Sequence, residues 1–157
     1  MAAAMKALLP LLALAAAAAC GPAGAHQYDR GDLHIAHPWS RPAGQGMTGA
    51  GYLTVTNTGA KPDVLLAVET PASDKAEIHE SSTAGGVARM RKLKTGLVIP
   101  AGGKAVLQPG GAHIMMLKLK RPLTVGDKVP ATLVFRNAGR VRVEFTVDKP
   151  VAEKHAH

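Results

Sequence analysis

The sequence predicts an all-β protein, an antiparallel β-sandwich around one hydrophobic core. Three observations support this prediction. The chain has 157 residues, of which 46% are hydrophobic, so it is long enough for one ordinary domain and too short for two. Its 17 Gly and 11 Pro disfavour long helices and favour many turns. Apolar residues recur at every second position in short runs, and no stretch keeps a helical period.

Ten short runs of alternating or β-branched residues follow one another along the chain, and each has the pattern of a strand. Turn signals rich in Gly or Asn separate many of them, because these residues readily supply the positive φ angle of a tight turn. We expect seven to nine strands, with alternate residues such as Leu133, Phe135, Val143 and Phe145 facing the core. The runs are residues 32–41, 49–59, 63–70, 75–82, 87–93, 96–102, 104–111, 113–120, 129–137 and 140–150.

The first 25 residues have the features of a secretory signal peptide. Positive groups stand at the N-terminus and at Lys6, residues 7–19 form an apolar run, and small residues at 23–25 form a cleavage site. The apolar run is shorter than the ~20 residues that a membrane-spanning helix needs. We therefore expect cleavage before His26, export, a folded domain over residues 26–150 and a flexible tail over residues 151–157.

A second processing route stays open at Cys20. Residues 17–20 are Ala-Ala-Ala-Cys, which resembles the box of a lipoprotein signal peptidase, and that cut would leave Cys20 as a lipidated N-terminus. Cys20 is the single cysteine of the chain, so the sequence holds no disulfide framework and no four-cysteine zinc site. Cleavage before His26 would leave no cysteine at all, which suits an oxidising compartment.

Charge and motif content exclude several classes of function. The chain has 19 Lys and Arg against 11 Asp and Glu, a net charge of +8. The cations are scattered singly, without a basic run or a basic helix, so we expect no nucleic-acid partner. The sequence contains no nucleophile–base pair, phosphate-binding loop or pair of catalytic acids, and we therefore expect a protein that is not an enzyme.

One candidate ligand pair lies on the predicted strand over residues 113–120. His113 and Met115 are two residues apart, so the period of a strand places both side chains on one face. Ile114 and Met116 then point to the other face, toward the core. An imidazole and a thioether on one face are able to share one metal ion.

A second candidate pair lies in a predicted hairpin over residues 76–91, whose Gly-rich turn brings His79 near Met90. Glu77 and Glu80 flank His79 and are expected to be solvated, although either carboxylate could orient the imidazole. Two imidazoles and two thioethers form a soft, thiolate-free donor set, which favours Cu(I). Zinc sites more often use Cys, His or carboxylate. In the alternative interpretation, these His and Met residues only pack in a structural or adhesive sandwich.

The segments "AEIHE", "VARMR" and "IPAGGKAVLQPGGAHIMML" closely resemble the periplasmic copper chaperone family called PCu(A)C. That family's signature is a His and a Met about ten residues apart, followed after about twenty-one residues by His-x-Met. Here ten residues separate His79 from Met90, and twenty-two residues separate Met90 from His113. The resemblance extends to "GDLHIAHPWSRP", "GAGYLTVTNTG" and "PLTVGDKVPATLVFRNAG". Carried over by position, the family's copper ligands fall on His79, Met90, His113 and Met115.

The resemblance also implies a fold and a function. The fold would be a cupredoxin-like β-sandwich with Greek-key connections, in a monomer located in the periplasm. The protein would bind Cu(I) and deliver it by ligand exchange to the dinuclear copper centre of cytochrome c oxidase subunit II, alone or with Sco-type proteins. Its basic surface would steer it to an acidic partner face. The membrane would be reached through the partner or through a lipidated Cys20. The alternative function is copper storage or tolerance.

The histidines at the chain ends have two interpretations, as residues without a metal role, which we favour, or as a second copper site. His155, His157 and, if it is the new N-terminus, His26 offer imidazole and amine nitrogens, which suit Cu(II). An exported Cu(II) enzyme that uses the N-terminal His26 is therefore a further alternative. A blue-copper electron-transfer site is disfavoured, because it needs a thiolate and no cysteine follows Cys20.

Overall fold

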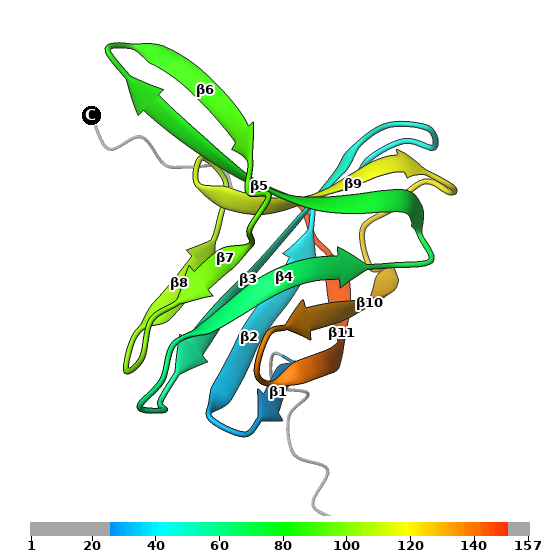
Figure 1. Cartoon of the computed structure of the whole chain (residues 1–157). Coiled ribbons are helices and arrows are strands. Elements are labelled where there is room, and N and C mark those ends of the chain that lie inside the picture. The colour runs from blue at the N-terminus through cyan, green and yellow to red at the C-terminus, as the bar shows by residue number, and fades with distance from the viewer. Residues whose placement is uncertain (1–25, 151–157) are drawn as a thin grey trace, which may run out of the picture.

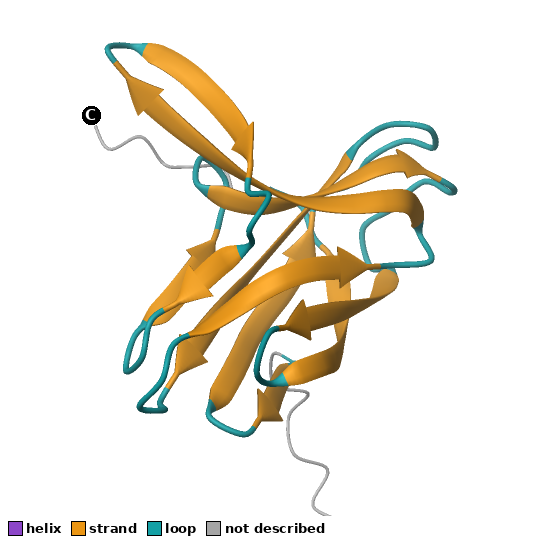
Figure 2. Ribbon diagram, in the orientation of Figure 1, coloured by secondary structure: helices purple, strands orange, loops and turns teal. Residues whose placement is uncertain are grey.

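The computed structural model of the protein describes residues 26–150, and Figures 1 and 2 show these residues as strands joined by loops. No helix in this part of the chain is long and apolar enough to cross a membrane. The prediction of an all-β protein is confirmed. The strands are β1 (Gln27–Arg30), β2 (Leu33–Ser40), β3 (Gly49–Asn57), β4 (Asp63–Glu69), β5 (Ser73–Ala84), β6 (Val87–Lys92), β7 (Leu97–Ile99), β8 (Lys104–Leu107), β9 (Ala112–Leu119), β10 (Lys128–Phe135) and β11 (Gly139–Val147).

The prediction of seven to nine strands was too low, since residues 26–150 form eleven. β1 was missed because it lies largely on the surface and lacks the alternation of apolar residues that marks a half-buried strand. β7 and β8 are short, but the turn at Gly102, where φ is +65°, divides them into two separate strands. The ten predicted runs all contain a strand.

The strands form one hydrogen-bonded sheet in the order β6-β5-β9-β8-β3-β2-β11-β10-β4-β7, with β1 paired to β2. Most neighbours are antiparallel, and the pairs β2–β11 and β8–β9 are parallel. The sheet curls on itself, so that β4 contacts β5 and β7 contacts β8 around one core. Most of these pairings join segments that are far apart in the sequence.

Alternate residues of the strands fill this core as predicted. Leu133, Phe135, Val143 and Phe145 are all buried. Gly51 of β3 lies against the Phe145 ring, and a Cβ atom at this glycine would be 3.1 Å from the ring carbon Cε1. The missing side chain therefore leaves the space that the phenyl ring occupies.

β5 connects the body of the protein to a projecting hairpin. Its first part pairs with β9, and its second part pairs with β6, which ends the sheet. Figure 1 shows the β5–β6 hairpin extending beyond the other strands, and every residue of β6 is exposed. Gly85 and Gly86 form the turn with φ angles of +59° and +77°. Positive angles at both positions match a tight two-residue hairpin turn, so the predicted hairpin is confirmed.

Candidate metal centre

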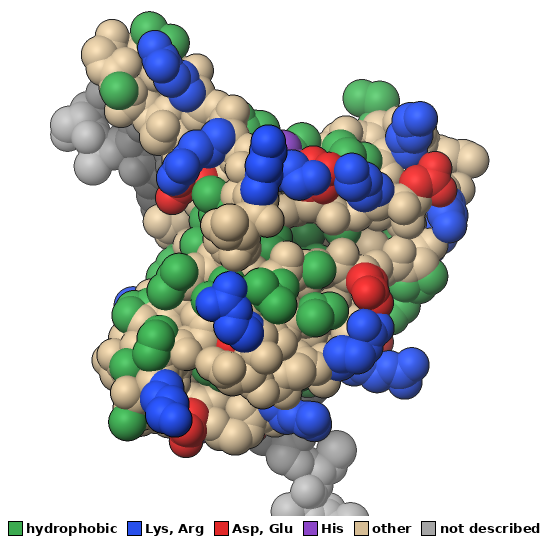
Figure 3. All heavy atoms as spheres, viewed as in Figure 1, with side chains coloured by type: hydrophobic (Ala, Val, Ile, Leu, Met, Phe, Trp, Pro, Cys, Tyr) green, Lys and Arg blue, Asp and Glu red, His purple; other side chains and the backbone are tan. Residues whose placement is uncertain are grey.

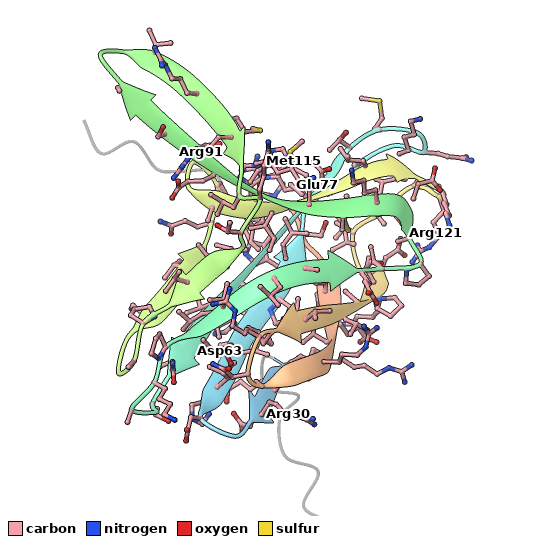
Figure 4. All side chains as sticks on the ribbon, in the orientation of Figure 1. Arg30, Asp63, Glu77, Arg91, Met115 and Arg121 are labelled. Atoms are coloured by element: carbon pink, nitrogen blue, oxygen red, sulfur yellow. The ribbon has the colours of Figure 1, made fainter. Side chains whose placement is uncertain are left out.

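The antiparallel register of β5 and β9 brings the two predicted histidines together. His79 lies directly opposite His113, and Glu77 lies directly opposite Met115. The two imidazole rings have centroids 6.0 Å apart and are tilted by 34°. The intervening Ile114 is buried in the core, so the four paired side chains share the outer face of the two strands. Figure 4 shows Glu77 and Met115 close together where β5 and β9 run side by side.

The hairpin adds Met90 to the same face. Met90 on β6 lies directly opposite Ser81 on β5, and Lys92 lies directly opposite His79. Directly opposite residues of an antiparallel pair point to one side, and Ser81 is two residues from His79, so Met90 faces the side that carries both histidines. The side chain of Met90 is 55% exposed. The three adjacent strands β6, β5 and β9 therefore present all four predicted ligands on one face.

A surface hollow of about 370 Å³ opens on this face, and its walls include Met90, His113 and Met115. His79 does not line the hollow, but its ring lies beside that of His113. Within residues 26–150, no group of three or more His, Cys, Asp or Glu side chains is arranged to hold a metal ion. The hollow is lined by one imidazole, that of His113, and two thioethers, with the His79 imidazole beside them, and this is the donor chemistry that Cu(I) prefers.

The hydrogen bonds of His79 leave one of its nitrogens free for a metal. Nε2 lies 2.9 Å from Oε2 of Glu77, so this nitrogen carries the proton and donates it to the carboxylate. Nδ1 then holds the lone pair. Nδ1 is buried and has no hydrogen-bond partner among residues 26–150, a state that usually costs about 1–3 kcal/mol for a buried polar group. A bound metal ion would satisfy this atom.

His113 shows the same division of roles with the two nitrogens exchanged. Its Nδ1 lies 3.0 Å from the carbonyl oxygen of Gly111 and donates to it. The lone pair is therefore on Nε2. His113 is only 7% exposed, so its ring is held in place by packing as well as by this hydrogen bond. A ring with one nitrogen donating to an oxygen and the other left free is typical of metal-binding histidines.

Glu77 is held in its charged form by three donors. Lys75 and Lys92 each place Nζ 2.8 Å from its Oε1, and His79 donates to Oε2. The hydrogen bonds from Lys75, Lys92 and His79 hold the pKa of Glu77 well below its ordinary value. The carboxylate is therefore ionised at neutral pH and is available to orient His79.

The expectation that both glutamates are solvated was wrong for Glu77. Its side chain is only 12% exposed, because it lies between cations on two neighbouring strands. Glu80 is more exposed and pairs with Arg91. The period of two that relates Glu77 to His79 is the sequence signal that identifies the orienting carboxylate.

Other walls of the hollow come from the loop between β2 and β3 and from β3 itself, and sequence reasoning did not assign their residues to the site. Arg41, Thr48 and Tyr52 line it, and the Arg41 guanidinium lies 5.7 Å from the centroid of the Tyr52 ring. These residues lie more than 60 positions before His113 in the chain, and no motif connects them to it. Only the pairing of β3 with β9 brings them to the site.

Of the second predicted copper site, the structure describes one residue. His26 is exposed, and its Nε2 lies 3.5 Å from Nζ of Lys128. His155 and His157 lie outside the described residues, as do Cys20 and the predicted signal peptide. The second site therefore stays a prediction.

Comparisons with known proteins give one family and several similar proteins. The family model described as "Putative lipoprotein LpqE-like" matches residues 33–147. "Putative lipoprotein Lxx21020" of Leifsonia xyli subsp. xyli is 36% identical over 115 residues, which cover 73% of this chain and 69% of that protein. "Uncharacterized protein RP573" of Rickettsia prowazekii is 29% identical over 124 residues, which cover 75% of this chain and 68% of that protein.

Solved structures with the same fold include three described by their metal state. The "Apo PCuAC domain from PmoF1" has a TM-score of 0.67 and 33% identity, over 80% of this chain and 100% of that one. The "Copper-bound PCuAC domain from PmoF2" has a TM-score of 0.67 and 26% identity, over 80% of this chain and 99% of that one. The solution structure of the Cu(I) form of DR1885 from Deinococcus radiodurans has a TM-score of 0.62 and 31% identity, over 82% of this chain and 85% of that one.

Proposed function

This chain belongs to the LpqE-like lipoprotein family and has the β-fold of PCuAC domains, and from this premise we propose that it is an exported carrier of Cu(I) and not an enzyme. The resemblance to PCu(A)C proteins is confirmed by the similar structures, two of which hold copper. One observation supports the proposal above the others. Two imidazoles, each with one nitrogen left free, meet two thioethers on one face of β5, β6 and β9.

Copper is the cargo of this site. Cu(I) is soft and monovalent, and neutral imidazole and thioether ligands bind it without the thiolate that a blue-copper site needs. His79, Met90, His113 and Met115 would hold the ion, with Nδ1 of His79 and Nε2 of His113 as the nitrogen ligands. Glu77 and the Gly111 carbonyl would keep the two rings in the binding orientation.

The openness of the site favours transfer over storage. Met90 is mostly exposed on a hairpin that projects from the body, so the ligand of an acceptor can reach the ion from solvent. We propose that an incoming Cys or Met displaces Met90 first, while the buried His113 holds the ion until the new bonds are formed. A storage protein would gain nothing from an exposed ligand.

The charge around the site indicates the kind of acceptor. Residues 73–94, which include β5 and β6, contain five Lys or Arg and three Asp or Glu, and Lys118, Lys120 and Arg121 follow on and after β9. Figure 3 shows Lys and Arg side chains along the ridge that β5 and β6 form. This surface would steer the carrier to an acidic partner. We propose cytochrome c oxidase subunit II and Sco-type proteins as acceptors, in the periplasm, with Cys20 as a lipid anchor if it is processed.

The test is a Cu(I) titration against a competing chromophoric chelator under anaerobic, reducing conditions. The wild-type protein is compared with the double variant His113→Ala/Met115→Ala and with His34→Ala, whose imidazole is exposed on β2 and bonds to Asp29. We expect one tightly bound Cu(I) per chain in the wild type and in His34→Ala, and its loss in the double variant.

Two other outcomes would contradict the proposal in different ways. Unchanged binding in the double variant would place the metal elsewhere in the chain, for example at His26, His155 and His157. Absence of binding in the wild type would exclude the copper carrier. Circular dichroism of the double variant checks that the fold is retained, because both substituted side chains lie on the outer face of β9.

A further inference from the structure

Arg41 lies in the wall of the metal hollow and has no acidic partner among residues 26–150. It directly follows β2, where its backbone N–H donates to the Ala50 carbonyl over 3.3 Å. The buried hydroxyl of Ser40 donates to two carbonyls, those of Ala50 and of Arg41 itself. The backbone at Arg41 is therefore fixed against β3. This anchoring places an arginine side chain in the hollow that Met90, His113 and Met115 line.

An aromatic platform holds the guanidinium of Arg41. The guanidinium carbon lies 5.7 Å from the centroid of the Tyr52 ring, at the distance of a cation–π contact. Tyr52 is buried and packs on Trp39, with ring centroids 4.6 Å apart. The arginine is thus positioned by packing, without the hydrogen bonds that would occupy its N–H groups.

Arg91, Arg121 and Arg140 each contact a carboxylate, those of Glu80, Asp127 and Glu69. Among residues 26–150, the Arg41 side chain has no ion pair and no hydrogen bond. Arg89, Arg136 and Arg142 are also without a side-chain partner among residues 26–150, but Arg41 is the arginine of this part of the chain whose Nε is buried without one. Arg41 therefore lines an open hollow with a charged guanidinium that no carboxylate among residues 26–150 neutralises, and this arrangement suits an anion from outside the chain.

We propose that Arg41 is the binding residue of a carboxylate subsite next to the copper site, and that it anchors a carboxylate carried by the ligand that removes the copper. The planar guanidinium matches a carboxylate with two parallel N–H donors. The hollow has a volume of about 370 Å³, which is larger than one ion requires, so it has room for a small organic group beside the ion. The role in copper exchange rests on the proposed function, but the binding of carboxylate does not.

Binding of the carboxylate at Arg41 would bring the incoming ligand close to the copper that it removes. A ligand that carries both a thiol and a carboxylate would be held by Arg41 with its sulfur near the metal, which raises the local concentration of the attacking group. The incoming sulfur forms a bond to the metal as a protein thioether leaves, and the thiol proton passes to solvent. Copper stays Cu(I) throughout.

The first arm of the test needs no copper. The metal-free protein, labelled with ¹⁵N and processed as in the cell, is titrated with propionate at constant ionic strength, and the Nε–H resonance of Arg41 is followed. Propionamide is the uncharged probe of the same shape. We expect a saturable shift with propionate in the millimolar range and none with propionamide. The variant Arg41→Gln should lose the accompanying shifts of the Met90 and Met115 methyl groups, and Arg89→Gln, on the exposed β6, should keep them.

The second arm uses the Cu(I)-loaded protein. The rate of copper removal is measured with 3-mercaptopropionate and with its amide, and each rate in Arg41→Gln is divided by the rate in the wild type. Because a charged bidentate pair is lost only with the carboxylate thiol, we expect about a tenfold slowing with this thiol and less than about a twofold change with the amide. Arg41→Lys should slow copper removal by 3-mercaptopropionate less than Arg41→Gln does, since lysine keeps the positive charge but cannot donate two parallel N–H bonds to the carboxylate. Added propionate should slow copper removal by 3-mercaptopropionate, because it competes for Arg41, and should not slow removal by the amide.

The outcomes separate this inference from the proposed function. A propionate shift that is not saturable, or that propionamide reproduces, would overturn the subsite. Equal slowing with both thiols would also overturn it, since Arg41 would then act on the metal site as a whole. If the protein fails to bind Cu(I), the proposed function is wrong, and the titration of the metal-free protein still decides whether Arg41 binds carboxylate.

Discussion

The hydrogen bond between His79 and Glu77 determines which imidazole nitrogen is able to bind a metal. In Glu77→Gln the acceptor loses its charge, and its amide is able to donate as well as accept, so His79 is held less firmly. We expect the Cu(I) affinity to fall about tenfold, at the lower end of the effect of losing such an orienting group. Chelator competition measures the change. Glu80→Gln is the matched control, since Glu80 bonds to Arg91, and an equal loss in both variants would exclude an orienting role for Glu77.

Another carboxylate, Asp127, makes the stability of the protein depend on pH. Its Oδ2 accepts hydrogen bonds from the backbone N–H and the hydroxyl of Thr124 and contacts Arg121. The hydrogen bonds from Thr124, with a smaller effect of Arg121, lower the pKa of Asp127 below its ordinary value of 3.8. A lowered pKa in the folded state stabilises the fold above that ordinary value, and the contribution is lost as the pH falls through the folded-state pKa.

We therefore expect Asp127→Asn to unfold at a lower temperature than the wild type at pH 7. The two melting temperatures should converge as the pH falls below 3.8 and the wild-type carboxylate takes up its proton. Thermal unfolding by circular dichroism between pH 7 and pH 2.5 measures both. Asp74→Asn is the control, because Asp74 has only a 3.7 Å contact to Lys120. A difference between Asp127→Asn and wild type that stays constant with pH would contradict this account.

The β5–β6 hairpin and the strand that carries His113 and Met115 were predictable from the sequence. The strands that pair with them in the sheet were not. A period of two and a Gly-Gly turn are local signals, and they correctly placed His79 near Met90 and put His113 on the face of Met115. The pairing of β5 with β9 joins residues that are far apart in the sequence, so no local signal predicts it, and the resemblance to a known family implied only that His79 and His113 bind the same ion. The approach of Arg41 depends on the β3–β9 pairing, for which the sequence has no signal.

The hairpin turn offers a test of how β6 contributes to the site. Gly85 and Gly86 have positive φ angles, so Gly85→Ala/Gly86→Ala would strain the turn by about 1–3 kcal/mol per residue. Since every residue of β6 is exposed, we expect the β5–β6 hairpin to fray while the rest of the protein stays folded. Hydrogen exchange should show faster exchange confined to residues 81–91, and the Cu(I) affinity should fall.

Gly126→Ala provides the comparison for this prediction. Gly126 also has a positive φ angle, but it lies in the loop between β9 and β10, away from the hairpin. This variant should lower the melting temperature without changing the exchange of residues 81–91. If the hairpin variant instead lowers the melting temperature as much as Gly126→Ala does, β6 supports the whole fold and not only the site.

At the scale of the whole molecule, the core and the metal face are separate. Phe145 is 1% exposed in the core, and the predicted ligands lie on the outer face of β5, β6 and β9. We expect Phe145→Ala to reduce the free energy of unfolding by about 3–5 kcal/mol, because it removes a buried ring and leaves a cavity. The Cu(I) affinity of the folded protein should not change. Urea unfolding and chelator competition below the transition measure the two effects, and a parallel loss of affinity would show that the core and the site are coupled.

The position of β6 at the end of the sheet has a consequence for the association of the protein with itself. An edge strand presents unpaired N–H and C=O groups, and in many proteins such an edge is a starting point for aggregation. Here Arg89, Arg91 and Lys92 line the edge, so two copies that met through β6 would bring like charges together. A strand rich in Asp and Glu would meet no such repulsion and would lie about 4.8 Å from β6, next to Met90. The charges that keep copies of the carrier apart would therefore leave this edge open to an acidic acceptor.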